Sequence, residues 1–102
     1  MENIIKLKEN GSALGLRELA KQIGVNIKNA INENKNIILD FDKVNSISSS
    51  FADELIAKIM LECGQEKFVN LVKIRNTNDF VKAMITNSII QRLESQEQNK
   101  QN

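Results

Sequence analysis

The stretch from Asn36 to Leu55, "NIILDFDKVNSISSSFADEL", decides the fold. It contains "IILDF", which is apolar on both alternating faces and therefore predicts a strand covered on both sides, as in sheets flanked by helices. We expect this segment to be the central strand. Three consecutive serines follow where the strand gives way to a helix. Their hydroxyls could cap that helix, act as a catalytic nucleophile, or form a switch that another protein modifies.

A helix is predicted to begin at these serines. Its apolar residues recur at spacings of three and four, which is typical of a helix with one buried face. They are Phe51, Ala52, Leu55, Ile56, Ile59, Met60 and Cys63. Gly64 ends the pattern and is expected to form the C-terminal cap. Cys63 is therefore interpreted as a core residue and not as a reactive thiol.

Further strands and helices are predicted on both sides of this stretch. Residues 3–8, "NIIKLK", predict a short strand, and the apolar spacing from Leu16 to Ile31 predicts a helix, in which Gly24 marks a kink or a close packing contact. Downstream, "KFVNLVKI" at 67–74 predicts a third strand, and "NTND" starts a third helix whose apolar face ends at Leu93.

The order of these elements predicts the fold class. Strands and helices alternate three times, which favours an α/β layer fold with a mostly parallel or mixed sheet of about four strands and three to four helices. Right-handed crossovers make the strands at 37–41 and 67–74 parallel neighbours. We expect one domain over residues 1–93, and a disordered polar tail over residues 94–102, "ESQEQNKQN".

Composition excludes several classes of function. The chain has 102 residues, 14 basic and 13 acidic side chains, and a formal charge of +1, so no basic surface for nucleic acid stands out. It lacks histidine, which removes most zinc sites, and its single cysteine excludes an internal disulfide. We expect no metal, no cofactor and no membrane segment. A cytoplasmic location is expected.

The serines themselves favour a cap over catalysis. Ser50 stands three residues before Asp53, which predicts a capping box between the two. A nucleophilic serine needs a base, yet the chain has no histidine, no Ser-x-x-Lys pair lies here, and no glycine flanks the serines as in a nucleophile elbow. We therefore expect that the protein is not an enzyme.

The same stretch carries a resemblance to a known family. Together with the preceding "LREL" helix and the following "G..KF..LVKIRN", it resembles the bacterial STAS-like domains of unknown function. These are similar in turn to the STAS domain, which is named for sulfate transporters and anti-sigma factor antagonists. The likeness covers residues 4–93, and "SSSFADE" is its most specific element.

The resemblance implies a partner-switching protein. Such an antagonist binds a kinase-like ATPase of the anti-sigma factor type and is released when a serine at the start of the helix is phosphorylated. In the antagonists the strand reads Leu-Asp-Leu, whose acidic position matches Asp40, and the turn reads Asp-Ser-Ser-Gly. Ser49 and Ser50 match its two serines and are the phosphorylation candidates, whereas Ser48 and Phe51 depart from its aspartate and glycine. Only one strand is expected before the first helix, where longer STAS domains have a hairpin.

Two functions remain open at this point. The first is a noncatalytic regulatory module that binds a protein partner through the serines and the polar face of the helix. Its expected binding residues are Ser48, Ser49, Ser50, Asp53, Glu54 and Lys58. The alternative is a sensor of a nucleotide or another small anion, held by backbone donors and hydroxyls at the start of the helix, without phosphorylation.

Overall fold

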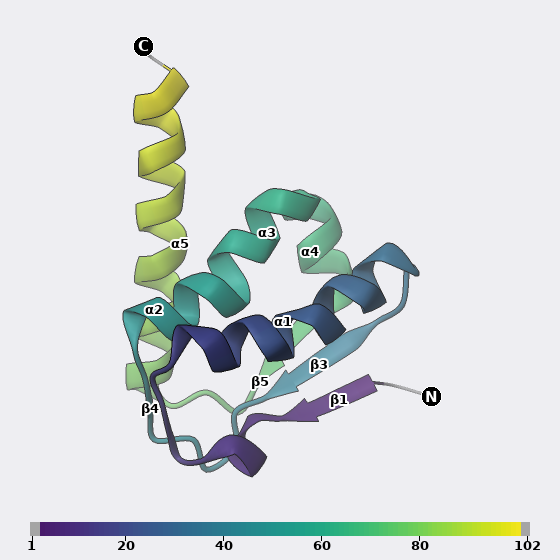
Figure 1. Ribbon diagram of the computed structural model, residues 1–102, viewed down its shortest axis with the longest axis vertical. Helices are drawn as coiled ribbons and strands as arrows, with labels where there is room; N and C mark the ends of the chain where they lie inside the picture. Colours follow the sequence, from purple (N-terminus) through teal and green to yellow (C-terminus); the bar gives the residue numbers. More distant parts are fainter. Residues whose placement is uncertain (1–2, 101–102) are drawn as a thin grey trace.

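The computed structural model describes the backbone of residues 3–100 and the side-chain burial of residues 3–96. Helices and short strands alternate along the chain (Figure 1). In order, the elements are β1 (Asn3–Lys6), the 3-10 helix η1 (Leu7–Asn10), β2 (Ala13–Leu14), α1 (Arg17–Asn32), β3 (Ile37–Asp40), β4 (Ser46–Ile47), α2 (Ser49–Ala52), the π-helix η2 (Asp53–Ala57), α3 (Lys58–Cys63), α4 (Gln65–Leu71), β5 (Val72–Arg75) and α5 (Asp79–Lys100). The segments α2, η2 and α3 follow one another without a break and form one long helical stretch.

The main sheet has three parallel strands in the order β1-β3-β5. Ile37 pairs with Asn3 on one side and with Val72 on the other, so β3 is central and runs parallel to β5. Both expectations are confirmed. Two strands precede α1 instead of the single one expected, because β2 comes between β1 and that helix.

The expected fourth strand lies outside this sheet. β2 and β4 form a separate two-stranded parallel ladder, in which Ala13 pairs with Ser46. The chain leaves β3 through a tight turn in which Lys43 has a φ of 64° and the Val44 N–H donates to the Phe41 carbonyl oxygen at 3.0 Å. This turn redirects the chain, so that β4 pairs with β2 and does not extend the main sheet.

The helices cover one face of the main sheet. Figure 1 shows α1, α3 and α4 on the same side of the strands, with α5 standing at one end. Two helical layers were expected from the doubly apolar β3, and that expectation is wrong. On the opposite face Ile38 is only 4% exposed, because its cross-strand neighbours Ile4 and Lys73 flank it on the same face.

The third predicted strand is wrong in its first half. Residues 65–71 form α4, and only Val72–Arg75 is a strand. The reason is that Phe68 and Leu71 lie three residues apart, a spacing that places both on one face of a helix but on opposite faces of a strand, so only a helix turns both toward the core. Gly64, with a φ of 102°, separates α3 from α4 and confirms the predicted end of the preceding helix.

The last helix extends further than the apolar pattern. Residues 94–100 belong to α5, although we expected disorder from Glu94. Glutamine, glutamate and lysine are good helix formers, so a polar segment can continue a helix that is already anchored by its packed first turns. The expected domain boundary after Leu93 stays a prediction, and residues 101–102 of the expected tail lie outside the described residues.

One hydrophobic core joins the helices to the sheet. Leu39, Phe51 and Ile56 are fully buried in it, and Cys63 packs against it as a partly buried side chain, which confirms its interpretation as a core residue. A Cβ atom on Gly24 would lie 3.1 Å from Ile59 Cδ1, so this glycine marks a close contact between α1 and α3. Within residues 3–100, no helix combines the length and apolar character needed to cross a membrane.

Candidate functional site at the serine turn

Ser48 is the residue that caps the helix. The Phe51 N–H donates to Ser48 Oγ at 3.0 Å, and the same hydroxyl donates to the Gly15 carbonyl oxygen at 2.8 Å. The predicted capping box between Ser50 and Asp53 is therefore wrong. The helix begins at Ser49, so Ser50 already lies inside its first turn, where its hydroxyl does not act as the N-cap.

The serine turn, Ser48 to Ser50, is held in place from two sides. The Ser48 N–H donates to the Leu14 carbonyl oxygen at 2.9 Å, which ties the turn to β2. At the start of α5, the Asn78 side chain donates to the Asn45 carbonyl oxygen at 3.0 Å and accepts from the Val81 N–H at 2.7 Å. These bonds fix the approach to the turn, so Ser49 and Ser50 are presented on a well-supported backbone.

Ser49 and Ser50 open onto a polar hollow, which we call the serine hollow. Ser49 is exposed and Ser50 is half-buried. The volume of the hollow is about 290 Å³, and α1, α2, η2 and α5 all contribute to its wall. Its lining residues are Arg17, Ser49, Ser50, Asp53, Gln91, Arg92 and Ser95.

Five charged side chains form a connected network beside the hollow, which we call the arginine cluster: Arg17, Asp53, Glu54, Lys58 and Arg92. Arg92 forms a two-pronged bond to Asp53, with Nε–Oδ1 at 2.6 Å and Nη2–Oδ2 at 2.7 Å. Arg17 Nη1 bridges the two carboxylates, at 3.1 Å from Asp53 Oδ2 and 3.0 Å from Glu54 Oε1. Lys58 Nζ completes the network, at 3.2 Å from Glu54 Oε2.

This network keeps both carboxylates ionised. The hydrogen bond from Arg92 is the largest influence on Asp53 and lowers its pKa from the ordinary value of 3.8, with Arg17 acting in the same direction against the effect of burial. Burial alone would raise the pKa of Glu54, but the hydrogen bonds from Arg17 and Lys58 outweigh it and the pKa is lowered. Neither carboxyl group carries a proton at neutral pH, so neither is suited to act as a general acid.

The structure divides the predicted partner-binding residues into two groups. Ser49 and Ser50 face the serine hollow, whereas the Ser48 hydroxyl is used within the fold. Glu54 is only 5% exposed, so the expectation that it lies on the exposed polar face of the helix is wrong. Asp53 and Lys58 are half-buried and bonded to other members of the arginine cluster.

Arg17 and Arg92 were not predicted as site residues. They lie on α1 and α5, at 36 and 39 positions from Asp53, and no local spacing links them to it. Only the packing of α1 and α5 on η2 brings them together. A pairing of this kind carries no signal in a single sequence.

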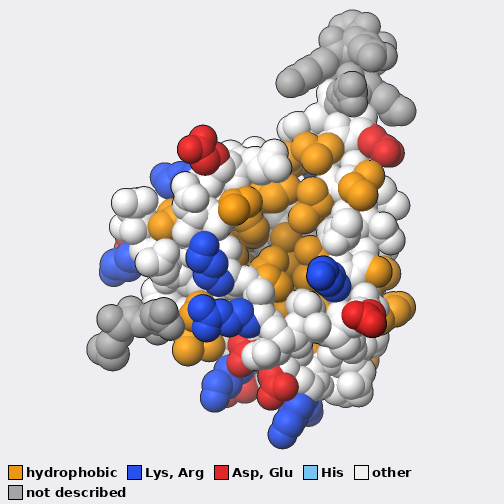
Figure 2. All heavy atoms as spheres, turned by 180° about the vertical axis from the view of Figure 1, so that it is seen from behind, with side chains coloured by type: hydrophobic (Ala, Val, Ile, Leu, Met, Phe, Trp, Pro, Cys, Tyr) orange, Lys and Arg blue, Asp and Glu red, His pale blue; other side chains and the backbone are white. Residues whose placement is uncertain are grey.

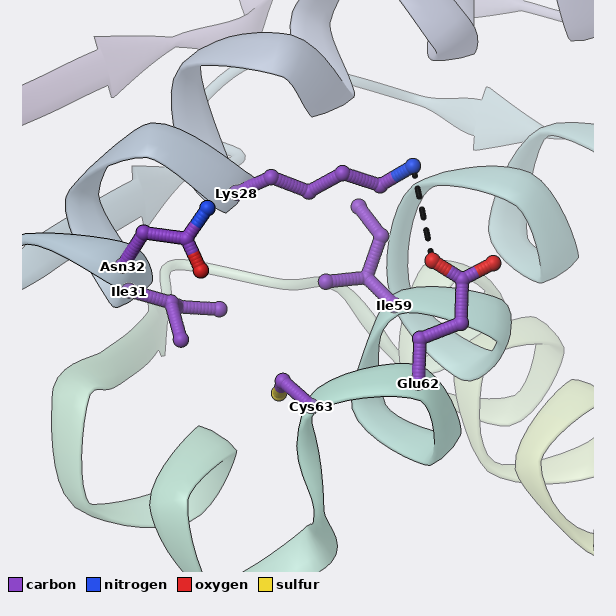
Figure 3. Close-up of a pocket in the computed structure, with 6 residues that line it drawn as sticks. All are labelled: Lys28, Ile31, Asn32, Ile59, Glu62 and Cys63. Atoms are coloured by element: carbon purple, nitrogen blue, oxygen red, sulfur yellow. Dashed lines mark ion pairs between the residues drawn. The ribbon is translucent and has the colours of Figure 1, made fainter.

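A second hollow, of about 240 Å³, lies between α1 and α3 (Figure 3). Lys28 reaches across it to Glu62, with Nζ–Oε2 at 3.5 Å, and Cys63 lies at its base. Burial raises the pKa of the Cys63 thiol, which opposes formation of the reactive thiolate. Within the described residues, no group of three or more Cys, Asp or Glu side chains is arranged to hold a metal ion.

One comparison with known proteins found a match. A family model described as "STAS-like domain of unknown function (DUF4325)" matches residues 20–82. The match includes β3, the serine turn and β5, while Arg17 and Arg92 both lie outside it. No curated protein and no solved structure matched the chain.

Proposed function

The chain belongs to the family of STAS-like domains of unknown function, and on this premise we propose that it is a noncatalytic regulatory module that binds a protein partner through the serine turn. The resemblance to anti-sigma factor antagonists suggests a kinase-like ATPase as the partner. The observation that carries the proposal is that the three serines have different structural roles. Ser48 alone provides the cap, which leaves Ser49 and Ser50 available for contact with a partner.

The absence of catalysis is part of the proposal. The chain has no histidine, and the nearest lysine on the same helix, Lys58, is bonded to Glu54. A serine nucleophile would therefore need a base that this region does not offer in its present arrangement. Binding by shape and charge, without a reaction, is the function that these residues support best.

Phosphorylation of Ser50 is the proposed means of control. A phosphoserine adds about 1.5 to 2 negative charges at neutral pH. Asp53 and Glu54, within one turn, are already paired with Arg17, Arg92 and Lys58, so a phosphate adds net negative charge to the surface that a partner shaped for a neutral hydroxyl must desolvate. The start of a helix tolerates an anion, so the fold should survive the modification.

The test compares Ser50→Asp with Ser50→Ala in binding to a kinase-like ATPase from the same genome. We expect Ser50→Asp to weaken binding at least tenfold, because a fixed negative charge opposes the partner surface. Ser50→Ala should bind like the parent, and the melting temperatures of all three should agree closely. Enzymatically phosphorylated protein is the reference, since aspartate imitates the phosphate only in part.

Two results would count against the proposal. If Ser50→Asp bound as tightly as the parent, negative charge at Ser50 would not control partner binding. A loss of stability in Ser50→Ala as large as its loss of affinity would mean that Ser50 has a structural role only.

A small-anion sensor is the second candidate, and the serine hollow favours it. Arg17 and Arg92 line this hollow together with three serines, which is suitable chemistry for a phosphate group. Both arginines already bond Asp53, so an anion has to compete with that carboxylate. A melting-temperature rise with inorganic phosphate or ATP that disappears in Arg17→Gln would select the sensor over the protein-binding module.

A further inference from the structure

The free edge of β5 is a second surface, separate from the serine turn. β5 is the last strand in the order β1-β3-β5, so within residues 3–100 its outer edge has no neighbouring strand. The Arg75 carbonyl oxygen accepts from the Phe41 N–H at 2.9 Å, on the side of β3. Backbone groups alternate along a strand, so the N–H and C=O of Ile74 point the other way, toward the free edge.

An apolar groove lies along this edge, which we call the β5 groove. Its volume is about 440 Å³, within the range of roughly 300–1,000 Å³ of pockets that hold ligands. α4, β5, η2, α3 and α5 provide its lining residues: Ile56, Met60, Phe68, Val69, Val72, Lys73, Ile74, Arg75 and Ile89. Figure 2 shows apolar surface beside α5 in the view from behind, with Lys and Arg side chains on both sides of it.

The groove remains open because α5 packs elsewhere. This helix lies against η2, α2 and β4, and of its residues up to 96 only Ile89 lines the groove. Val69, on the opposite wall, is 56% exposed. Apolar side chains that stay exposed in a hollow next to an unpaired strand edge mark a surface suited to a partner.

The charges at the groove have one sign. Within residues 3–96, Lys73 and Arg75 are its only charged lining residues, and neither forms an ion pair. Lys73 Nζ donates to the Val69 carbonyl oxygen at 3.2 Å, and Arg75 lies beside Asp40 on the neighbouring strand. The other edge of the sheet differs, because the hollow along β1 mixes apolar residues with asparagines, and the charged residue in its lining is the acidic Glu33.

The sequence of β5 indicates which side chains a partner strand would need in order to pair with this edge. Val72 and Ile74 lie on the helix-covered face, whereas Lys73 and Arg75 lie on the open face. A strand added beside β5 would place alternate side chains on these same two faces. Apolar residues would enter the groove, and the residues between them would stand opposite Lys73 and Arg75, where acidic side chains form favourable cross-strand pairs.

We infer that β5 accepts an extended segment of a partner protein in which apolar and acidic residues alternate. The segment adds a fourth strand to the main sheet and bonds the backbone of Ile74. Its apolar side chains fill the β5 groove, and its carboxylates pair with Lys73 and Arg75. Strand addition of this kind draws affinity from the main chain and specificity from the alternate side chains.

The experiment uses the full chain and a short fluorescent peptide of alternating valine and glutamate. We expect saturable binding by anisotropy and slower hydrogen exchange of the Ile74 amide in the complex. A Lys73→Glu/Arg75→Glu double variant should bind this peptide about tenfold more weakly, because two attractive pairs become repulsive. The same variant should gain affinity for a peptide in which lysine replaces glutamate.

Two matched peptides separate strand addition from simple charge attraction. A peptide of the same composition, with the valines and glutamates in two blocks, should bind poorly, as should the alternating peptide when N-methylated along one backbone edge. Equal binding of these controls, an unchanged affinity of the charge-reversed variant, or no binding at millimolar peptide would overturn the inference. So would a dimer of the free chain that protects the Ile74 amide, because the edge would then be occupied by a second copy.

Discussion

In the arginine cluster, every charged side chain forms an ion pair with another residue of the cluster. Asp53 accepts hydrogen bonds from two arginines, Arg17 and Arg92. In the β5 groove, Lys73 and Arg75 have no such ion pair within the described residues. Both regions line hollows of the same small domain, and η2 contributes a residue to each wall. The comparison indicates that the charges of the arginine cluster stabilise the fold, whereas those of Lys73 and Arg75 are available to a partner.

The contrast also changes how the serine turn is understood. Asp53 and Glu54 stand in the first turns of the helix after the serines, a position that suggests an acidic binding surface. In the structure both are neutralised by Arg17, Arg92 and Lys58. A partner at the serine turn therefore meets hydroxyls beside paired charges, whereas a partner at β5 meets two cations that form no ion pair with the described side chains.

The largest effect should come from the core that both regions share. Ile56 lies in η2, is fully buried and forms part of the floor of the β5 groove, and Leu39 is fully buried in β3. Ile56→Ala and Leu39→Ala should each lower the free energy of unfolding by about 2 to 5 kcal/mol, as buried aliphatic truncations do. Chemical denaturation measures this loss.

Val69→Ala is the matched control, because Val69 is 56% exposed on the groove wall. It should change the free energy of unfolding by no more than about 0.5 kcal/mol. Losses below about 1 kcal/mol for both Ile56→Ala and Leu39→Ala would show that the core is not where the structure has it.

An intermediate effect is expected in the arginine cluster. Asp53→Asn keeps the shape of the side chain but removes the charge that Arg92 and Arg17 bond, and it should cost about 1 to 2 kcal/mol at pH 7. The pKa of Asp53 is lowered in the folded state, so its contribution is fully present above the unfolded pKa and is lost as pH falls through the folded pKa. The difference between parent and variant should therefore shrink below about pH 4.

Lys73→Gln removes one charge at the β5 groove and is the control for this comparison. It should leave the free energy of unfolding within about 0.5 kcal/mol of the parent at every pH, because Lys73 pairs with no carboxylate of the residues whose side chains the structure describes. A constant difference between Asp53→Asn and the parent from neutral to acid pH would contradict the assignment of Asp53 as a stabilising ion-pair member.

The smallest effect on stability distinguishes Ser48 from Ser49. Ser48→Ala removes the cap and should cost about 1 kcal/mol by denaturation. Ser49→Ala should cost a few tenths of a kcal/mol at most, because the exposed Ser49 side chain has no capping role. If the two variants lost equal stability, Ser48 would not be the serine whose hydroxyl stabilises the helix as its cap.

Much of the fold follows from local pattern. β3, α1 and the helical stretch after the serine turn are marked by runs or spacings of apolar residues, and Gly64 ends that stretch because its backbone conformation suits glycine. The parallel pairing of β3 and β5 follows from the handedness of crossovers. These features depend on residues that are near in sequence or on a general rule of chain topology.

Other features depend on contacts that a single sequence does not encode visibly. The spacing of Phe68 and Leu71 suits a helix with one buried face, but the apolar run around them also fits a strand covered on both faces, and tertiary packing decided for α4. β2 and β4 have two residues each, too few for any periodicity. Ser48 became the cap because its hydroxyl also reaches Gly15, a contact that depends on how β2 lies against β4.

The purely parallel pairing has a consequence for the time course of folding. Asn3 pairs with Ile37 and Ile37 with Val72, so each ladder of the main sheet closes a long loop and none is a local hairpin. Such contacts form slowly compared with helices, because the loop must close before the pairing is gained. During synthesis from the N-terminus, β1 and β3 are available before β5, and β3 is the open edge of a two-stranded intermediate. β5 is the last strand of the main sheet to be synthesised, so Lys73 and Arg75 reach the edge of the sheet only after β1 and β3 are available.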